Sequence, residues 1–262
     1  MCRIIFASGN VDVSKIMNSI IHMAKDENSL HEMNKGIPGK WQHADGWGVA
    51  YLTEKGTFKI KKSAQAIFAD PEVNKLHKIK TRLLLAHVRR KAGSEVAQEN
   101  THPFQANHAS LGKCIFCHNG CIKDNIAFSP DYALKGETDS ERLFYSILSD
   151  ITENKDEKIA AAIQGNLQRY AQTKGSNIVL TTADKTFVAV RKNQVPKYYG
   201  MSIGEGSDFM IISSEKLKTF PDISWRSVLP GEVVIVNNGT KQFFVREEGI
   251  PLLQKIVAMI RN

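Results

Sequence analysis

The stretch Met1-Cys2-Arg3-Ile4-Ile5-Phe6-Ala7, followed by Ser8-Gly9-Asn10, opens the chain and determines its first element. Residues 2–7 are short and mostly apolar, and turn-forming residues follow them, which predicts a buried β-strand. Apolar residues then recur at near-helical intervals between Val13 and Ala24, which predicts a helix. A strand and then a helix therefore begin the fold, with a cysteine at the first position of the strand.

Further along the chain, strand-like and helix-like segments come in blocks, and a polar segment over residues 26–45 is expected to be a long loop of the kind that often serves as a lid. This order predicts one α+β domain over residues 1–262, with mixed or antiparallel sheets. A hairpin is expected from strands 46–52 and 57–61. The other expected strands are 82–89, 113–122, 178–182, 187–191, 209–213, 233–236 and 242–245. The other expected helices are 71–77, 139–148, 157–170 and 250–260.

Composition excludes several classes of protein. The 262 residues include 42% apolar residues, enough for a sizeable core, but no run approaches the roughly 18 to 20 apolar residues of a membrane span. The first residues lack the features of a secretory signal, and four cysteines are too few for a disulfide scaffold. We therefore expect a cytoplasmic protein with reduced thiols.

The formal net charge of +8 makes an anionic partner conceivable, because summed charge steers association over long distances. The Lys and Arg residues are spread along the chain, however, and no common nucleic-acid-binding module is present. We therefore do not expect nucleic acid as a partner.

Cys2 gains interest from its position next to the initiator methionine. A small side chain at position 2 generally permits removal of Met1, which would give Cys2 a free α-amine beside its own thiol. A cysteine thiol has a pKa of about 8.5 and is only slightly ionised at neutral pH, whereas an α-amine with a pKa of about 7.7 to 8.0 can accept its proton. Without removal of Met1, a buried structural thiol is the simpler interpretation.

Cys2 and five further short motifs resemble, in the same order along the chain, the class II glutamine amidotransferase domain of the N-terminal-nucleophile hydrolases. Each motif is weak alone, but their joint order is specific, and it covers roughly the first 150 residues. The motifs are Cys2; His43-Ala44-Asp45-Gly46-Trp47-Gly48; Ala86-His87-Val88-Arg89; Asn100-Thr101-His102-Pro103-Phe104; His118-Asn119-Gly120; and Gly136-Glu137-Thr138-Asp139-Ser140-Glu141.

The resemblance implies a four-layer αββα sandwich, in which helices flank two mainly antiparallel sheets, and no metal or organic cofactor. It implies that Cys2 attacks the side-chain amide of glutamine or of a γ-glutamyl compound and forms a γ-glutamyl thioester. Asn119 and Gly120 would hold the oxyanion; from the residues alone, Asn-Gly is equally a common turn.

The same resemblance implies residues that bind the substrate. Arg89 would bind the substrate α-carboxylate, although an ordinary ion pair at a strand end is the alternative. Asp139 would pair with the α-ammonium, and it also suits the start of a helix. Asp45, Gly46, Trp47, His87 and His102 would line the pocket, although Trp47 is as well explained as a core residue and His102 as a structural histidine.

Substrate preference is the point at which the sequence departs from the family. Many members place an aromatic residue and then Thr soon after the Arg that corresponds to Arg89, whereas Arg90-Lys91-Ala92 follow Arg89 here. The additional positive charge favours a substrate with a second carboxylate, such as a γ-glutamyl peptide. The resemblance is greatest to small stand-alone γ-glutamyl hydrolases, but an ammonia-supplying subunit that works with a separate synthase remains open.

A metal- or haem-binding protein is the alternative from a different class. Cys114, Cys117, His118 and Cys121 have spacings found in zinc sites, and Cys114 to His118 match a c-type haem attachment motif. Ile115-Phe116 favour a strand, on which Cys114 and Cys117 would point to opposite faces. We therefore expect these cysteines to be structural.

Overall fold

The first sheet contains seven strands and has β1 (Cys2–Gly9) near its centre. β1 is hydrogen-bonded between β4 (Leu83–Arg89) and β10 (Phe209–Ser213), so it is covered along both edges. This enclosure matches its nearly continuous apolar sequence. The other strands are β2 (Trp47–Leu52) and β3 (Phe58–Ser63) beyond β4, and β9 (Ser202–Glu205) and β11 (Ser224–Ser227) beyond β10.

The second sheet contains six strands in the order β13-β12-β8-β7-β6-β5. Every strand pairing described in both sheets is antiparallel. The strands are β5 (Phe104–His108), β6 (Gly112–Gly120), β7 (Ser176–Thr181), β8 (Lys185–Val190), β12 (Val233–Asn237) and β13 (Phe243–Arg246).

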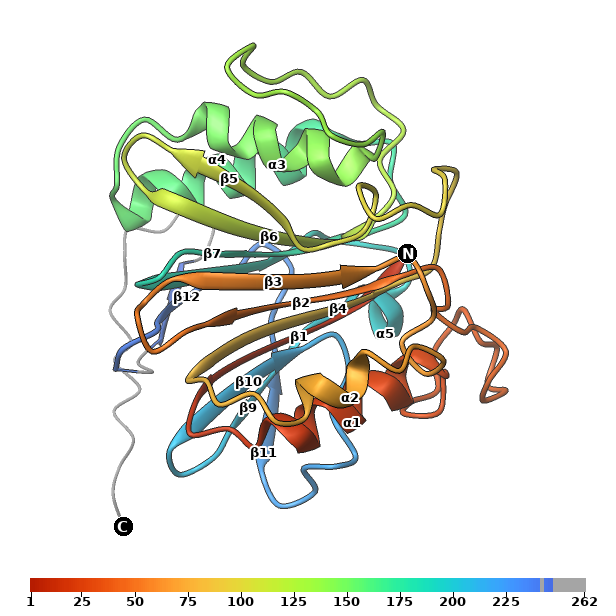
Figure 1. Ribbon diagram of the computed structural model, residues 1–262. Coiled ribbons are helices and arrows are strands. Elements are labelled where there is room, and N and C mark those ends of the chain that lie inside the picture. Colours follow the sequence, from red (N-terminus) through yellow and green to blue (C-terminus); the bar gives the residue numbers. More distant parts are fainter. Residues whose placement is uncertain (241–242, 247–262) are drawn as a thin grey trace.

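Helices cover the outer face of each sheet, and the two sheets pack face to face between them (Figure 1). α1 (Val13–Ala24) and α2 (Val73–Leu76) lie on the first sheet, and α3 (Asp139–Asp150) and α4 (Asp156–Arg169) lie on the second. Three apolar cores result: one between the sheets and one beneath each helical layer. The chain thus has the four-layer αββα sandwich that the resemblance implied.

Local signals explain where α1 and α3 begin. The Asp12 carboxylate accepts a hydrogen bond from the Lys15 backbone N–H and caps α1. At α3 the Thr138 hydroxyl accepts from the Glu141 N–H, so Thr138 is the cap and Asp139 is the first helical residue. A short helix, α5 (Pro196–Tyr199), begins at a proline, which suits the first turn of a helix.

The computed structural model describes residues 1–240 and 243–246. Residue 242 of the last expected strand and the expected helix 250–260 lie outside the described residues. Within them, the expected α1 and β10 agree to the residue, and residues 26–45 contain no helix or strand. The sequence did not predict β5, β9, β11 or α5, and the strand expected over 113–122 ends at Gly120.

Candidate active site

Cys2 lies at the start of β1 and faces the space between the two sheets. Alternate residues of a strand point to opposite faces, and Ile4 and Phe6, which share the face of Cys2, belong to the core between the sheets. Only 4% of Cys2 is exposed. Its backbone nitrogen donates a hydrogen bond of 2.7 Å to Oδ1 of Asn119, which comes from the facing β6 strand.

Asn119 has one half of its side-chain amide engaged and the other half free. Ile115 and Cys117 on β6 face the core between the sheets, and the strand alternation places Asn119 on the same face. While Oδ1 accepts from Cys2, Nδ2 is buried and has no hydrogen-bond partner among the described residues. A donor therefore lies unused beside Cys2, and Gly120 follows as the last residue of the strand.

Met1 continues the pairing between β1 and β4 by one residue. Its amine donates to the Arg90 carbonyl oxygen at 2.7 Å, and the Arg90 N–H donates to the Met1 carbonyl oxygen at 2.7 Å. The nitrogen of Cys2 is thus an amide here and cannot act as a base. Removal of Met1 would turn it into an amine and would free both backbone groups of Arg90.

Arg89 lies directly opposite Cys2 across the β1–β4 pairing, as its expected role requires. The side chain is buried, and its guanidinium donates to the backbone oxygen of Asp45 and to the hydroxyl and backbone oxygens of Ser94. No carboxylate within ion-pair distance of Arg89 was found in residues 1–240. A buried cation held only by neutral oxygens is a favourable partner for an incoming carboxylate.

Asp45 and Gly46 hold the Arg89 end of β4. The Gly46 carbonyl accepts from the Arg89 N–H at 2.8 Å, and the Asp45 carboxylate accepts from the Lys91 N–H at 2.9 Å. Gly46 has a φ of +123°, a conformation that favours glycine. This pair therefore fixes the backbone around Arg89.

Trp47 does not join the group around Cys2. Its indole packs in the core between the first sheet and the helices, and Nε1 donates to the Asp70 carboxylate at 3.0 Å. The expectation that the Trp47 side chain lines the pocket is therefore corrected: because Gly48 and Ala50 take the inner face of β2, strand alternation turns Trp47 outward.

The rings of His87 and His102 lie against one another near Cys2, with centroids 4.1 Å apart and ring planes tilted by 30°. Both rings are fully buried, and none of their four nitrogens has a well-formed hydrogen bond with another residue that the structure describes. Burial lowers the pKa of each well below its ordinary value. For His87 the nearby backbone oxygen of His118 opposes this shift. Both rings are therefore neutral at pH 7.

Gly48 makes room for His102. A β-carbon on Gly48 would clash with the backbone oxygen of His102 and with the ring of Pro103. The glycine thus lets the segment of His102 lie directly on β2, and this contact joins two motifs that are far apart in the sequence.

Asp139 is the first residue of α3, in the helical layer that covers the second sheet. Its Oδ2 accepts a hydrogen bond of 2.6 Å from the Ile122 N–H, just beyond the end of β6. Within the described part of the chain no Lys, Arg or His side chain forms an ion pair with it. Nearby His118 bridges the Ser140 and Ser176 hydroxyls, and burial lowers its pKa to about 4. A carboxylate without a cation thus lies at the end of the Asn119 strand.

The other cysteines do not form a cluster. Cys114 packs in the core beneath α3 and Cys117 in the core between the sheets, on opposite faces of β6. Burial raises the pKa of Cys114 to about 12 and that of Cys117 well above its ordinary value. This geometry does not support a metal or haem site built from Cys114, Cys117, His118 and Cys121.

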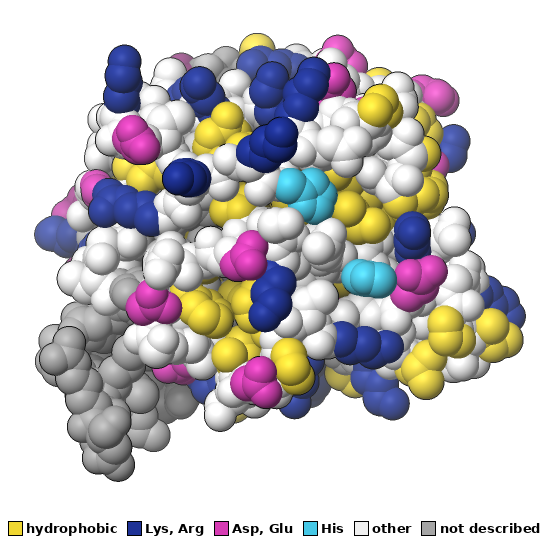
Figure 2. All heavy atoms as spheres, turned by 60° about the horizontal axis from the view of Figure 1, so that its bottom comes forward, with side chains coloured by type: hydrophobic (Ala, Val, Ile, Leu, Met, Phe, Trp, Pro, Cys, Tyr) yellow, Lys and Arg dark blue, Asp and Glu magenta, His cyan; other side chains and the backbone are white. Residues whose placement is uncertain are grey.

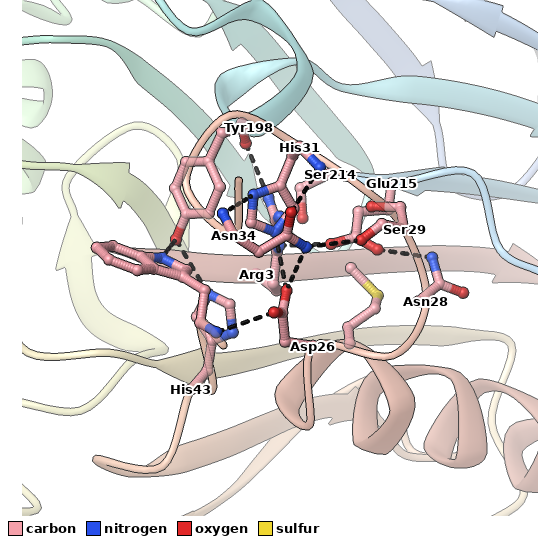
Figure 3. Close-up of polar contacts among 12 residues, drawn as sticks. Arg3, Asp26, Asn28, Ser29, His31, Asn34, His43, Tyr198, Ser214 and Glu215 are labelled. Atoms are coloured by element: carbon pink, nitrogen blue, oxygen red, sulfur yellow. Dashed lines mark hydrogen bonds and ion pairs between the residues drawn. The ribbon is translucent and has the colours of Figure 1, made fainter. Parts of the chain in front are cut away.

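Sequence reasoning missed a buried polar network on the outer face of β1 (Figure 3). Arg3, which is fully buried, forms an ion pair of 2.6 Å with Glu215, and its guanidinium lies 4.1 Å from the centroid of the Tyr198 ring. The Tyr198 hydroxyl in turn contacts Trp41 Nε1 and His43 Nε2. The signal was available, because a charged residue inside an apolar strand must have a partner.

Asp26 secures the other side of the same network. Its carboxylate lies 3.0 Å from His31 Nε2 and accepts hydrogen bonds from the Asn34 side chain and from the Trp41 N–H. The 26–45 loop is therefore held onto the first sheet by buried polar contacts. It ends at Asp45 and Gly46, so these contacts also position the residues around Arg89.

The charged surface shows no single basic stripe on the face seen in Figure 2. Lys and Arg side chains are spread over this face, with Asp and Glu side chains between them. Among the described residues, none of the helices is long and apolar enough to cross a membrane.

The four-layer fold, with a cysteine at the start of β1, is that of the N-terminal-nucleophile amidotransferases. The family model described as "Glutamine amidotransferases class-II" matches residues 29–197, more than half of the chain. The chain belongs to this family.

Two relatives are similar to this chain in sequence, and one solved structure is similar to it in fold. A protein of Haemophilus influenzae, named as a candidate glutamine amidotransferase, is 28% identical over 225 residues, which cover 76% of this chain and 75% of that protein. A candidate glutamine amidotransferase of Escherichia coli K12 is 34% identical over 142 residues, 53% of this chain and 49% of its own length. The glutamine phosphoribosylpyrophosphate amidotransferase of B. subtilis, solved with ADP and GMP, has the same fold, with a TM-score of 0.65 and 17% sequence identity. The match covers 96% of this chain and 50% of the B. subtilis chain.

Proposed function

We propose that the chain, once Met1 is removed, hydrolyses the side-chain amide of glutamine or of a γ-glutamyl compound with Cys2 as nucleophile. The observation that carries this proposal is the pairing of Cys2 with Asn119: the future amine is 2.7 Å from Oδ1, while Nδ2 is buried and unpartnered. Oδ1 would orient the amine, and Nδ2 would be directed at a developing oxyanion.

The reaction is a two-step acyl transfer. The Cys2 thiol passes its proton to the Cys2 α-amine as sulfur attacks the δ-carbonyl carbon, and the oxyanion is held by Asn119 Nδ2 and the Gly120 N–H. The ammonium returns the proton to the leaving nitrogen, which departs as ammonia or an amine and leaves a γ-glutamyl thioester. Water then attacks the thioester with the amine as base, and glutamate and the free thiol result.

Two unpaired charges support recognition of the α-carboxylate and α-ammonium groups of the substrate. Arg89 has no carboxylate partner and Asp139 no cationic partner in the described chain, and these charges match the α-carboxylate and α-ammonium of a γ-glutamyl group. A zwitterionic head would complete both pairs at once. His87 and His102 would form the neutral floor of the pocket beneath the sulfur.

A γ-glutamyl peptide is the substrate class we favour. Arg90 is partly engaged, because its guanidinium lies 4.1 Å from the Trp41 ring centroid and donates to the Gln42 carbonyl oxygen. Lys91 is exposed next to it and would meet a second carboxylate on the leaving group. A Lys91→Glu variant should therefore lose kcat/KM on a γ-glutamyl dipeptide more than on glutamine.

An ammonia-supplying role with a separate synthase is the second candidate. The B. subtilis neighbour is named an amidotransferase, and this chain matches only half of its length. If a partner protein accepts the ammonia, it should raise the glutaminase turnover of this chain on binding.

The proposal is tested by measuring kcat/KM on glutamine, glutamine analogues and γ-glutamyl dipeptides, with Cys2→Ala as the negative control. We expect turnover of at least one such amide, greater for a dipeptide than for free glutamine, and none for Cys2→Ala. Equal turnover by Cys2→Ala would refute the nucleophile, and a clear preference for glutamine would refute the peptide preference.

A further inference from the structure

Cys2, His87 and His102 form the one group of potential metal ligands found among the described residues, and it lies inside the proposed catalytic centre. One ligand atom from each residue lies within 4.8 Å of the other two, and all three residues are buried. The rings come from different segments: His87 from β4, and His102 from the segment laid over Gly48. This convergence is not explained by the acyl-transfer steps, which use neither ring as acid or base.

The two imidazoles have the state that a metal requires. Neither ring nitrogen of His102 has a hydrogen-bond partner among the described residues, and the His87 ring has only the nearby backbone oxygen of His118, although each ring is at least nine-tenths buried. Buried polar atoms without partners are rare in native proteins and call for a ligand or a bound water.

From this geometry we propose that Cys2, His87 and His102 bind a thiophilic divalent cation of the Zn²⁺ type, and that the cation reversibly blocks the nucleophile. One thiolate and two imidazoles are a ligand set that suits Zn²⁺. In the mature protein the Cys2 α-amine would supply a fourth ligand through a five-membered chelate with Sγ. The reaction itself needs no metal, so the cation would be an inhibitor, a consequence that rests on the proposed function.

Binding requires a modest contraction. Zn–S and Zn–N bonds of about 2.3 and 2.0–2.1 Å place tetrahedral ligand atoms roughly 3.5 Å apart, which is less than the upper limit of 4.8 Å seen here. In the proposed site, rotation of the Cys2 side chain and of the two rings would bring the ligand atoms closer together. The S–H proton leaves to the buffer as the Zn–S bond forms, and where the Cys2 amine is an ammonium its extra proton leaves in the same way as the Zn–N bond forms.

The test measures Zn²⁺ binding to the mature protein by calorimetry and Co²⁺ binding by absorption. We expect one equivalent of metal, a thiolate-to-cobalt charge-transfer band, and binding weakened at least about tenfold by Cys2→Ser and by His102→Asn. His22→Asn, an exposed histidine on α1, and Cys121→Ser, the half-buried thiol, are matched controls that should leave binding unchanged. Cys2→Ser is nearly isosteric, so the test holds even if His102→Asn fails to fold.

Absence of stoichiometric binding, or binding that survives Cys2→Ser, would overturn the proposal. Zn²⁺ should also inhibit amide turnover in competition with substrate, and a chelator should restore it. The two proposals fail separately: metal binding without amidase activity would refute only the proposed function, and amidase activity without metal binding would refute only the cation site.

Discussion

At the scale of single residues, the site is formed where strand ends from two sheets meet. Cys2 begins β1, Arg89 ends β4, and Asn119 comes near the end of β6. Strands of a packed sandwich are rigid, so the relative positions of these side chains are fixed before substrate arrives, which is what electrostatic stabilisation of a transition state requires. The free Nδ2 of Asn119 is the clearest sign of such preorganisation.

Replacing Asn119 by Ala should lower kcat by roughly 10²–10³-fold, because one oxyanion donor is worth about 2.7–4 kcal/mol. Steady-state kinetics on the best amide substrate measure the effect. Asn166→Ala is the matched control, since Asn166 is equally buried but lies in α4 and bonds to Asp150. A comparable loss of kcat in both variants would show that Asn119 acts only on the fold.

Replacing Arg89 by Lys should lower kcat/KM by roughly 10–100-fold, because hydrogen bonds to a charged group contribute about 1.5–3 kcal/mol and an ammonium cannot reproduce the planar fork. Substrates that lack the α-carboxylate should lose much less. Arg82→Lys, an exposed position just before the same strand, should change neither parameter. Equal losses on both types of substrate would contradict the assigned role.

Part of the geometry of the candidate site was predictable at this scale because its motifs are local in sequence. The order of Cys2, Arg89, Asn119 and Asp139 could be read from the chain, and the structure places Cys2, Arg89 and Asn119 together. The direction of the Trp47 side chain could not be predicted, because it depends on which face of β2 receives the His102 segment. The Arg3 network was missed because its partners come from segments some 200 residues away.

At the scale of elements, the contact of the His102 segment with β2 links the strands that carry the site. Gly48→Ala should destabilise the fold and displace His102, because the added methyl group meets backbone rather than a movable side chain. Thermal unfolding and kcat/KM measure the two effects. Gly165→Ala in α4, where no atom other than its chain neighbours and the helix's own backbone lies within 4 Å of the added carbon, should instead be neutral or stabilise by about 0.5–1 kcal/mol. Equal stability of the two variants would contradict this explanation of Gly48.

The Arg3–Glu215 pair holds the 26–45 loop and α5 against the first sheet. Glu215→Gln leaves a buried guanidinium without its carboxylate, and we expect a loss of about 3–5 kcal/mol in the free energy of unfolding. Denaturant unfolding measures this loss. Glu72→Gln removes an exposed ion pair with Lys75 and should change stability very little. A loss for Glu215→Gln as small as that for the control would show that the network does not support the loop.

The elements themselves were predictable to different degrees. Helices and strands with long apolar periodicity, such as α1 and β10, agree with their expected bounds. β9 and β11 are four residues each and carry little pattern, and β5 has two exposed polar residues on its face. Pairing with neighbouring strands, rather than local propensity, makes these segments into strands.

At the scale of the whole molecule, several neutral histidines are buried in the native state. Burial lowers the pKa of His43, His87, His102 and His118 below the value of 6.5 that each has in the unfolded chain. As pH falls below 6.5, the unfolded chain takes up more protons than the folded one, so stability must decrease. For His118, with a folded pKa of about 4, the loss extends over pH 6.5 to about 4.

The free energy of unfolding should therefore fall steeply across this pH range. A His118→Gln variant, which keeps a hydrogen-bonding side chain between Ser140 and Ser176, should show a shallower fall, whereas His22→Gln should follow the wild type. Denaturant titrations at several pH values measure the slopes. A stability that does not change between pH 6.5 and 4 would show that these rings are not neutral because of burial.

The central claim is that the thiol and the α-amine of Cys2 act together on an amide. Intact-mass analysis, combined with a measurement of turnover, is the most direct test of this claim. Protein whose mass shows Met1 removed should turn over a γ-glutamyl amide and, on rapid quenching, carry one γ-glutamyl group on Cys2. Protein with a Leu inserted after Met1, which blocks removal of the methionine, should do neither. Full activity in the chain that retains Met1 would contradict the account.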